Sequence, residues 1–251
     1  MDLGLTDRTY ILTGASGGLG LATAEALVAD GANVVISSRS QESVDRACAA
    51  LGPRAIGVAV DNADATAPAQ LIAAAQAGFG RLDGILISVG GPPAGPILDR
   101  TEDDWRLAFE SVFLGAIRLA VAVAEELGAG GSIAFVLSTS AKAPIPGLGI
   151  SNGLRPGLAM AAKNLADELG PRGIRVNALL PGRINTERVQ HLDAQSGDPE
   201  AARARAEATI PLGRYGEPAE FGRTAAFLLS PAASFLSGVM LPVDGGLTRS
   251  L

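Results

Sequence analysis

Two side chains able to bind or polarise a ligand stand four residues apart in GISNGLRPGL, residues 149–158. Ser151 carries a hydroxyl and Arg155 a guanidinium, and their spacing places both on one face at the start of an alanine-rich helix. A loop rich in glycine and proline precedes this helix. A hydroxyl and a cation directed together at a loop indicate a site, which is a working active site, a cofactor clamp or the remains of either.

A second group of residues, the loop TGASGGLG at positions 13–20, joins an expected strand to an expected helix. Gly14 permits the tight turn, while Gly18 and Gly20 allow the backbone to approach a ligand and the helix to pack on the sheet. The N–H groups at the start of the helix would then point at a pyrophosphate. Glycine-rich turns often serve geometry alone, but the position directly after the first strand favours a dinucleotide site.

The second expected strand ends in SSRS, where an acidic residue would accept a hydrogen bond from the 2′-hydroxyl of an adenosine ribose. This chain has Ser38 and Arg39 there instead. A guanidinium suits a 2′-phosphate, with which it forms paired charge-assisted hydrogen bonds. We therefore expect NADP(H) in preference to NAD(H), the alternative being an exposed loop arginine without a ligand.

The elements that must position these residues alternate along the chain. Short runs rich in β-branched residues predict strands at 9–14, 33–38, 55–60, 82–89, 132–138, 174–180 and within 237–246. Alanine-rich stretches predict helices at 20–31, 40–52, 65–80, 101–128, 152–169 and 217–230. Ser40 and Thr101 are the expected N-caps of two of these helices.

Strands that are apolar on both faces and joined through helices imply a parallel sheet covered on both sides. With right-handed crossovers, the expected fold class is α/β, a single doubly wound (Rossmann-type), mostly parallel sheet with helices on both faces. No change in composition and no internal repeat divides the chain, so we expect one domain over residues 1–251. The polar and charged segment 185–211 interrupts the alternation, and we interpret it as a mobile lid over the site.

Composition excludes several classes of partner. A net charge of −6 argues against nucleic-acid binding, which needs a basic surface. The N-terminus lacks the basic region of a secretory signal, and we expect no apolar run long enough to span a bilayer. A single cysteine, Cys48, and a single histidine, His191, exclude a disulfide within the chain and a Cys/His metal site. The expected location is the cytoplasm, without a metal, nucleic-acid or membrane partner.

These motifs, in this order, resemble those of the short-chain dehydrogenase/reductase family over essentially the whole chain. Residues 13–20 fit its TGxxxGxG loop, and PGRINT at 181–186 fits its PGxxxT motif. IRVNALLPG, GRYGEPAE and the terminal VDGG are similar as well, particularly to the branch of 3-oxoacyl-(acyl carrier protein) reductases.

The resemblance implies a set of cofactor-binding positions along the chain. They are Gly14, Ser16, Gly18, Leu19, Gly20, Ser38, Arg39, Asp61, Asn62, Gly90, Arg155, Pro181, Gly182, Ile184 and Thr186. Within this set, Asp61 would meet the adenine, and Ile184 and Thr186 would hold the carboxamide end of the nicotinamide.

The resemblance also implies a catalytic tetrad of Asn, Ser, Tyr and Lys, most of which this chain has changed. Ser138 matches the serine that polarises the carbonyl, whereas Ser151 stands where the proton-donating tyrosine is expected. Arg155 replaces the lysine that holds the nicotinamide ribose, and the asparagine position falls near Val112. The NNAG motif of the fourth strand is replaced by ISVG at 87–90.

The missing tyrosine leaves the source of the proton open. A serine hydroxyl is a far weaker acid than a phenol, and a guanidinium keeps its proton at neutral pH. Lys142, four residues past Ser138, would serve as a general acid if it were partly desolvated near Arg155, although a solvent-facing lysine is the alternative. In this hypothesis Ser138 and Ser151 orient a carbonyl, Arg155 clamps the ribose, and Lys142 or water delivers the proton.

Three functions are compatible with these residues. The first is an NADP(H)-dependent oxidoreductase that interconverts a carbonyl and an alcohol on a small or acyl-thioester substrate. The second is a catalytically inactive NADP(H)-binding sensor or scaffold, and the third is a non-redox enzyme on the same fold. The resemblance further implies a homotetramer or homodimer formed through the helices at 101–128 and 152–169.

Overall fold

The computed structural model describes residues 2–195 and 197–250. In this part of the chain, the strands form one sheet in the order β3-β2-β1-β4-β5-β6-β7, and all neighbouring strands are parallel. The strands are β1 (Thr9–Leu12), β2 (Asn33–Ser38), β3 (Ala55–Ala59), β4 (Gly84–Ile87), β5 (Ser132–Val136), β6 (Arg175–Pro181) and β7 (Met240–Val243). The expected doubly wound α/β fold is confirmed, with a sheet that is wholly rather than mostly parallel.

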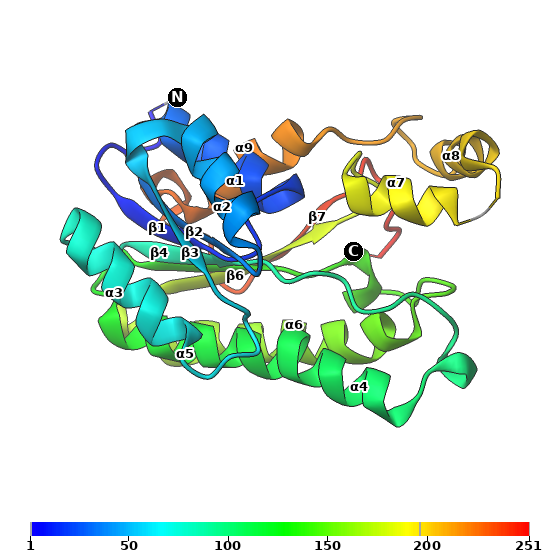
Figure 1. Ribbon diagram of the computed structural model, residues 1–251, viewed down its shortest axis with the longest axis horizontal. Coiled ribbons are helices and arrows are strands. Elements are labelled where there is room, and N and C mark those ends of the chain that lie inside the picture. The colour runs from blue at the N-terminus through cyan, green and yellow to red at the C-terminus, as the bar shows by residue number, and fades with distance from the viewer. Residues whose placement is uncertain (1, 196, 251) are drawn as a thin grey trace.

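Helices cover both faces of this sheet (Figure 1). They are α1 (Gly18–Ala29), α2 (Gln41–Leu51), α3 (Ala67–Phe79), α4 (Glu102–Ala108), α5 (Gly115–Glu126), α6 (Gly149–Leu169), α7 (Glu187–Ala194), α8 (Pro199–Glu207) and α9 (Pro218–Leu229). Helices α1, α2 and α9 pack on one face, and α3, α5 and α6 pack on the other. Helices α7 and α8 lie together beyond the carboxyl end of β6.

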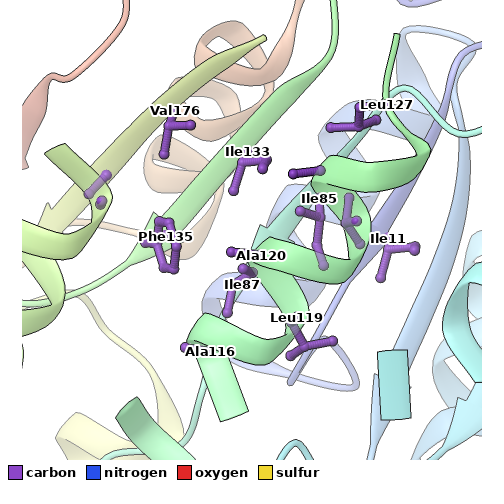
Figure 2. Packing of buried hydrophobic residues seen from close by; sticks show 14 of the residues in the cluster. Ile11, Ile85, Ile87, Ala116, Leu119, Ala120, Leu127, Ile133, Phe135 and Val176 are labelled. Atoms are coloured by element: carbon purple, nitrogen blue, oxygen red, sulfur yellow. The ribbon is translucent and has the colours of Figure 1, made fainter. Parts of the chain in front are cut away.

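Successive strand residues alternate between two hydrophobic cores. Ile85 and Ile87 of β4 pack beneath α5, whereas Leu86 between them packs on the side of α1 and α9. Figure 2 shows the first of these cores, where strand side chains such as Phe135 meet the alanine-rich face of α5. A strand buried on both faces needs apolar residues at consecutive positions, which explains the uninterrupted apolar runs in the sequence.

Local capping agrees with the expectations for two helices. The Ser40 hydroxyl accepts a hydrogen bond from the Ser43 N–H at the start of α2. Thr101 and Asp104 form a reciprocal capping box at the start of α4. Each cap satisfies N–H groups that would otherwise lack a partner within the helix.

Three expectations about helices need correction. The helix expected at 101–128 is divided by a π-helical turn, Phe109–Leu114, between α4 and α5. Helix α6 begins three residues before the expected start at 152, so Ser151 lies in its first turn. The segment 185–211 contains α7 and α8, because Thr186 and Asp198 each accept an N-capping hydrogen bond and start a helix. Their weak amphipathic pattern reflects surface helices whose apolar side chains are little buried.

The expectation that no apolar run could span a bilayer was wrong by length and composition. Among the described residues, the run Glu102–Glu126 meets that criterion. Its α5 portion buries Ala116, Leu119, Ala120 and Val123 in the core beneath the sheet. The apolar composition of this run therefore serves packing within the fold.

A buried arginine fastens the end of α9 to the sheet. Arg175 of β6 donates hydrogen bonds to the carbonyl oxygens of Leu228, Leu229 and Ser230. These carbonyls belong to the last turn and cap of α9, where no intrahelical donor remains. The guanidinium therefore satisfies the helix C-terminus and places its charge at the negative end of the helix dipole.

Candidate active site

A cavity of about 390 Å³ lies at the carboxyl ends of β1, β4, β5 and β6. The order of the strands reverses between β1 and β4, and ligands of open α/β sheets bind at this kind of switch point. The cavity is lined from four sides: the turn before α1, the segment Ser88–Pro93 after β4, Ser138 with the start of α6, and the segment from Pro181 to Leu192.

Only glycine fits at one position in the turn before α1 and at one position in the first turn of the helix. Gly14 has a φ of +59°, and a Cβ there would come within 2.8 Å of the Ser88 carbonyl oxygen. A Cβ on Gly20 would come within 2.7 Å of the Ala15 Cα, so α1 can pack closely on the turn. Gly17 is the N-cap and provides no side-chain hydrogen bond to the first turn. The turn therefore presents backbone N–H groups to the cavity and fits a pyrophosphate.

Several further positions expected to bind the cofactor lie on the same cavity. Gly90, Pro181, Gly182, Ile184 and Thr186 all line it. A Cβ on Gly90 would meet nothing within 4 Å, so the backbone faces open space there. A Cβ on Gly182 would come within 2.6 Å of the Asp244 Cβ, so glycine is required for the chain to pass the terminal VDGG segment.

The positions expected at the adenosine end lie outside this cavity. Arg39 is exposed and forms no hydrogen bond or ion pair with another described residue, so its guanidinium is free to bind an anion. Ser38 accepts a hydrogen bond from the Ser40 N–H, and Asp61 accepts one from the Ala63 N–H. Ser16, also outside, is half-buried in the turn before α1.

Asn62 has a positioning role in the structure. Its side-chain amide donates to the Thr13 hydroxyl at 3.2 Å and to the Ser88 carbonyl at 3.3 Å. The Thr13 hydroxyl also donates to that carbonyl, at 2.7 Å. These bonds join the ends of β1, β3 and β4, so they hold the glycine-rich turn in place beside the cavity.

The fold brings Ser138, Ser151 and Arg155 to one wall of the cavity. Ser138 follows β5, and its hydroxyl accepts a hydrogen bond from the Ser140 N–H. The hydroxyls of Ser151 and Ser140 lie 3.1 Å apart and share a buried hydrogen bond. Sequence reasoning missed Ser140; its only signal was its place in the same STS run as Ser138.

Arg155 is 4% exposed and lies deepest among these side chains. Its Nη1 donates to the Val136 carbonyl oxygen at 2.9 Å, while its Nε is buried without a hydrogen-bond partner among the described residues. Burial, with a smaller effect of the positive charge on Arg188, lowers the pKa of Arg155 to about 10. The guanidinium therefore stays protonated at neutral pH and carries a charge into the wall of the cavity.

Comparison with known proteins identifies the family. A family model described as enoyl-(acyl carrier protein) reductase matches residues 14–248. L-rhamnose 1-dehydrogenase (NAD(P)(+)) of Azotobacter vinelandii is 36% identical over 260 residues, covering 98% of this chain and 99% of that protein. The short-chain dehydrogenase/reductase glucose/ribitol dehydrogenase from Brucella melitensis superposes with a TM-score of 0.92 at 30% identity, with both chains covered completely.

The chain belongs to the short-chain dehydrogenase/reductase family. A further structure, L-sorbose reductase from Gluconobacter frateurii complexed with NADPH and L-sorbose, has a TM-score of 0.94 at 28% identity over the full length of both chains. The protein is thus an oxidoreductase of this family that uses a nicotinamide cofactor.

No phenol reaches the active-site cavity of this family member. Tyr10 is buried in β1, where burial raises its pKa to about 12. Tyr215 donates a hydrogen bond to the Asp193 carboxylate, and burial, followed by this bond, raises its pKa. Neither of the two tyrosines in the sequence lines the cavity.

Val112, near which the family's asparagine position is expected, lies in the π-helical turn. Val112 is buried in a small apolar cluster with Ala108, Ile150 and Leu154. This cluster packs the π-helical turn against the start of α6, so the position has a packing role here.

Lys142 does not meet the condition that its proposed role required. The structure places it on the surface of the loop before α6, exposed and outside the residues that line the cavity. A short helical turn, Thr139–Ala141, precedes it and turns the chain outward. Of the two alternatives for Lys142, the structure therefore shows the solvent-facing one.

Helix α7 adds cavity residues that sequence reasoning did not single out. Glu187, Arg188, Val189 and Leu192 line the cavity from this helix. The helix is anchored by Asp193, whose carboxylate accepts hydrogen bonds from Tyr215 at 3.0 Å and Arg183 at 3.2 Å. This anchor fixes the side of α7 that faces the cavity.

Proposed function

We propose that this protein is an NADP(H)-dependent oxidoreductase that interconverts a carbonyl and an alcohol on a small or acyl-linked substrate. The observation that carries the proposal is the convergence of Ser138, Ser151 and Arg155 on the cavity that the glycine-rich turn also lines. When bound, NADP(H) supplies the hydride. The residues of this chain bind and orient the reactants and provide hydrogen bonds to the substrate oxygen.

The preference for NADP(H) is supported by Arg39 at the end of β2. Its exposed guanidinium has no competing partner among the described residues and can form a bidentate pair with a 2′-phosphate. The chain has no acidic residue at 38–40 that would instead bind a free 2′-hydroxyl.

The hydroxyls of Ser138 and Ser151 have different hydrogen-bond partners and therefore different proposed roles. The Ser138 hydroxyl accepts from a backbone N–H, so its own proton is free to point at a substrate oxygen. The Ser151 hydroxyl is hydrogen-bonded to Ser140 and forms a second polar contact on the same wall. Arg155 lies beside them, holds the nicotinamide ribose and stabilises negative charge on the substrate oxygen without losing its proton.

The proton that completes carbonyl reduction comes from water in this proposal. Hydride addition to the carbonyl carbon leaves an alkoxide, and one proton from water converts it to the alcohol. The exposed position of Lys142 and the distant tyrosines favour water over either side chain.

The test is consumption of NADPH, followed by its absorbance, with a panel of small ketones, aldehydes and 3-oxoacyl thioesters. We expect turnover with some member of the panel and a decrease of about 10²-fold in kcat for Ser138→Ala, the effect of losing one oxyanion donor. Fluorescence titration of NADPH, with NADH as the comparison, tests binding separately. Binding without consumption would favour the sensor, and product without consumption would favour non-redox chemistry.

We also propose that the protein is cytoplasmic, that 185–211 acts as a lid, and that the chain forms a homotetramer or homodimer. The assembly is supported by exposed apolar side chains on the helices expected at the interface, which are Leu107, Val121 and Met160. Light scattering after size-exclusion chromatography tests it, with Met160→Glu expected to shift the mass toward the monomer.

A further inference from the structure

The charged groups that line the active-site cavity are unbalanced. Among its lining residues, the side chains charged at neutral pH are Arg155, Glu187 and Arg188. Neither arginine forms an ion pair with a described residue. Glu187 is exposed in the first turn of α7, where the helix dipole favours a carboxylate. The cavity is therefore lined by two guanidinium groups and one carboxylate, and neither guanidinium is in an ion pair with a described residue.

The missing counterion costs more free energy at Arg155, which is buried, than at Arg188. It is 4% exposed, and one carbonyl oxygen, that of Val136, is its only hydrogen-bond acceptor among the described residues. A buried charge without a counterion is expensive, and an unpaired buried donor such as its Nε adds to that expense. A ligand that brings negative charge into the cavity would offset both.

Arg188 lines the cavity from the first turn of α7; it is exposed overall, but its guanidinium is held in a defined position. Its Nη2 donates to the Pro92 carbonyl oxygen at 2.8 Å, and its guanidinium lies across Gly91, where a Cβ would come within 2.5 Å of Nε. The Asp193 anchor fixes α7 one turn further along. The remaining donors of Arg188 are free to form a bidentate pair with an oxyanion.

We propose that this cavity recognises a substrate that carries a carboxylate, with Arg188 pairing with the carboxylate and Arg155 sharing its negative charge. The inference rests on the proposed function and selects a small oxo or hydroxy acid from the substrates left open there. Pro92, Pro93, Leu148, Val189 and Leu192 line the same cavity and would contact the apolar part of such an acid.

A phosphate of the cofactor is the other oxyanion that could meet these arginines. The N–H groups of the glycine-rich turn and the guanidinium of Arg39 already provide for the pyrophosphate and the 2′-phosphate. Arg188 instead contacts Gly91 and Pro92 and lies two residues after Thr186, which is expected to hold the carboxamide of the nicotinamide. The substrate is therefore the favoured source of the anion.

Calorimetry with NADPH-saturated protein tests the inference without turnover. The probes are acetate, butanoate and hexanoate, each paired with its uncharged amide. We expect at least one carboxylate to bind about 10- to 100-fold more tightly than its amide, the range for hydrogen bonds to a charged group. Equal binding within every pair would overturn the proposal.

The matched variants are Arg188→Gln and Arg205→Gln, which remove the same charge from two exposed arginines, one lining the cavity on α7 and one outside it on α8. Arg188→Gln should abolish the preference for the carboxylate, Arg188→Lys should restore part of it, and Arg205→Gln should retain it. Circular dichroism confirms that each variant is folded. A carboxylate preference that survives Arg188→Gln in folded protein contradicts the role of Arg188.

Fluorescence titration of NADPH separates the two possible sources of the anion. Arg188→Gln should change NADPH affinity by less than about twofold, since the pair is assigned to the substrate rather than to the cofactor. A loss of NADPH affinity equal to the loss of carboxylate affinity would assign Arg188 to a cofactor phosphate and overturn the inference. Wild-type protein that binds no NADPH contradicts the proposed function, while carboxylate titrations without NADPH still test the arginine pair.

Discussion

The glycine-rich turn and the start of α6 line the same cavity but are built differently. The turn acts through its backbone, and close contacts at Gly14 and Gly20 leave no space for a side chain. The start of α6 acts through the side chains of Ser151 and Arg155, which project into a cavity that can accommodate other groups. A feature determined by backbone geometry thus tolerates little substitution, whereas side chains that line the cavity can be exchanged while the fold and the glycine-rich turn persist.

The largest expected effect comes from filling the turn. Gly14→Val places a β-branched side chain at a positive φ and against the Ser88 carbonyl. We expect a loss of about 2–5 kcal/mol in the free energy of unfolding from strain and overpacking, and NADPH binding too weak to detect. Urea denaturation and fluorescence titration measure the two effects. Gly17→Ala is the stability control, because a Cβ there meets nothing within 4 Å, and an equal destabilisation by it would contradict the argument.

Restoring the family's side chains at α6 should increase activity. In the double variant Ser151→Tyr with Arg155→Lys, a phenol beside an ammonium can donate the proton that water supplies in the proposed mechanism. We expect kcat for carbonyl reduction to rise about 10²-fold, within the usual range for general acid catalysis. The size-matched control is Ser151→Phe with Arg155→Lys. A similar gain in that control would show that the phenolic proton is not the cause.

Because its charge is buried without a counterion, Arg155 should lower the free energy of unfolding. Arg155→Met replaces it with an apolar side chain of similar length, and we expect the free energy of unfolding without added ligand to rise by about 1–4 kcal/mol. Thermal and urea unfolding measure this change, with Arg39→Met as the control at an exposed arginine. A destabilised Arg155→Met variant would mean that the hydrogen bond to Val136 outweighs the burial of the charge.

The difference in unfolding free energy between Arg155→Met and the wild type should depend on pH, which is a smaller and more specific effect. Because the pKa of folded Arg155, about 10, lies below that of a free guanidinium, the unfolded chain retains this proton at pH values where the folded chain loses it. The loss of unfolding free energy that Arg155 causes is therefore fully present below pH 10 and is relieved as pH rises above 10. The advantage of Arg155→Met should shrink between pH 9 and about pH 11 in unfolding measurements. A constant advantage contradicts a titrating Arg155.

The smallest expected effect is that of Lys142→Ala. Because Lys142 is exposed and outside the cavity, we expect kcat to change by less than about twofold. Steady-state kinetics across neutral to alkaline pH provide the measurement. A large decrease confined to kcat, with NADPH affinity unchanged, would return Lys142 to the mechanism as a proton donor.

The sequence alone determined the alternation of strands and helices, the parallel sheet and the glycine-rich turn. Each follows from patterns within a short stretch of chain: apolar runs for buried strands, Ser40 and Thr101 as caps, and glycine where the backbone must turn sharply. Local sterics and hydrogen bonding decide such features, so they can be predicted from neighbouring residues. The order of the motifs also predicted that Ser138, Ser151 and Arg155 belong to one site.

Only the tertiary structure decided which distant side chains meet and which turn away. It joined Ser140 to Ser151, brought Arg188 of α7 over Gly91, and directed Arg175 to the end of α9. It also left Lys142 at the surface, although its sequence position suggested the cavity. These outcomes depend on how helices pack on the sheet and on how loops turn over it. A side chain's spacing along the sequence fixes the face of its own element, but not the partner that the fold places opposite it.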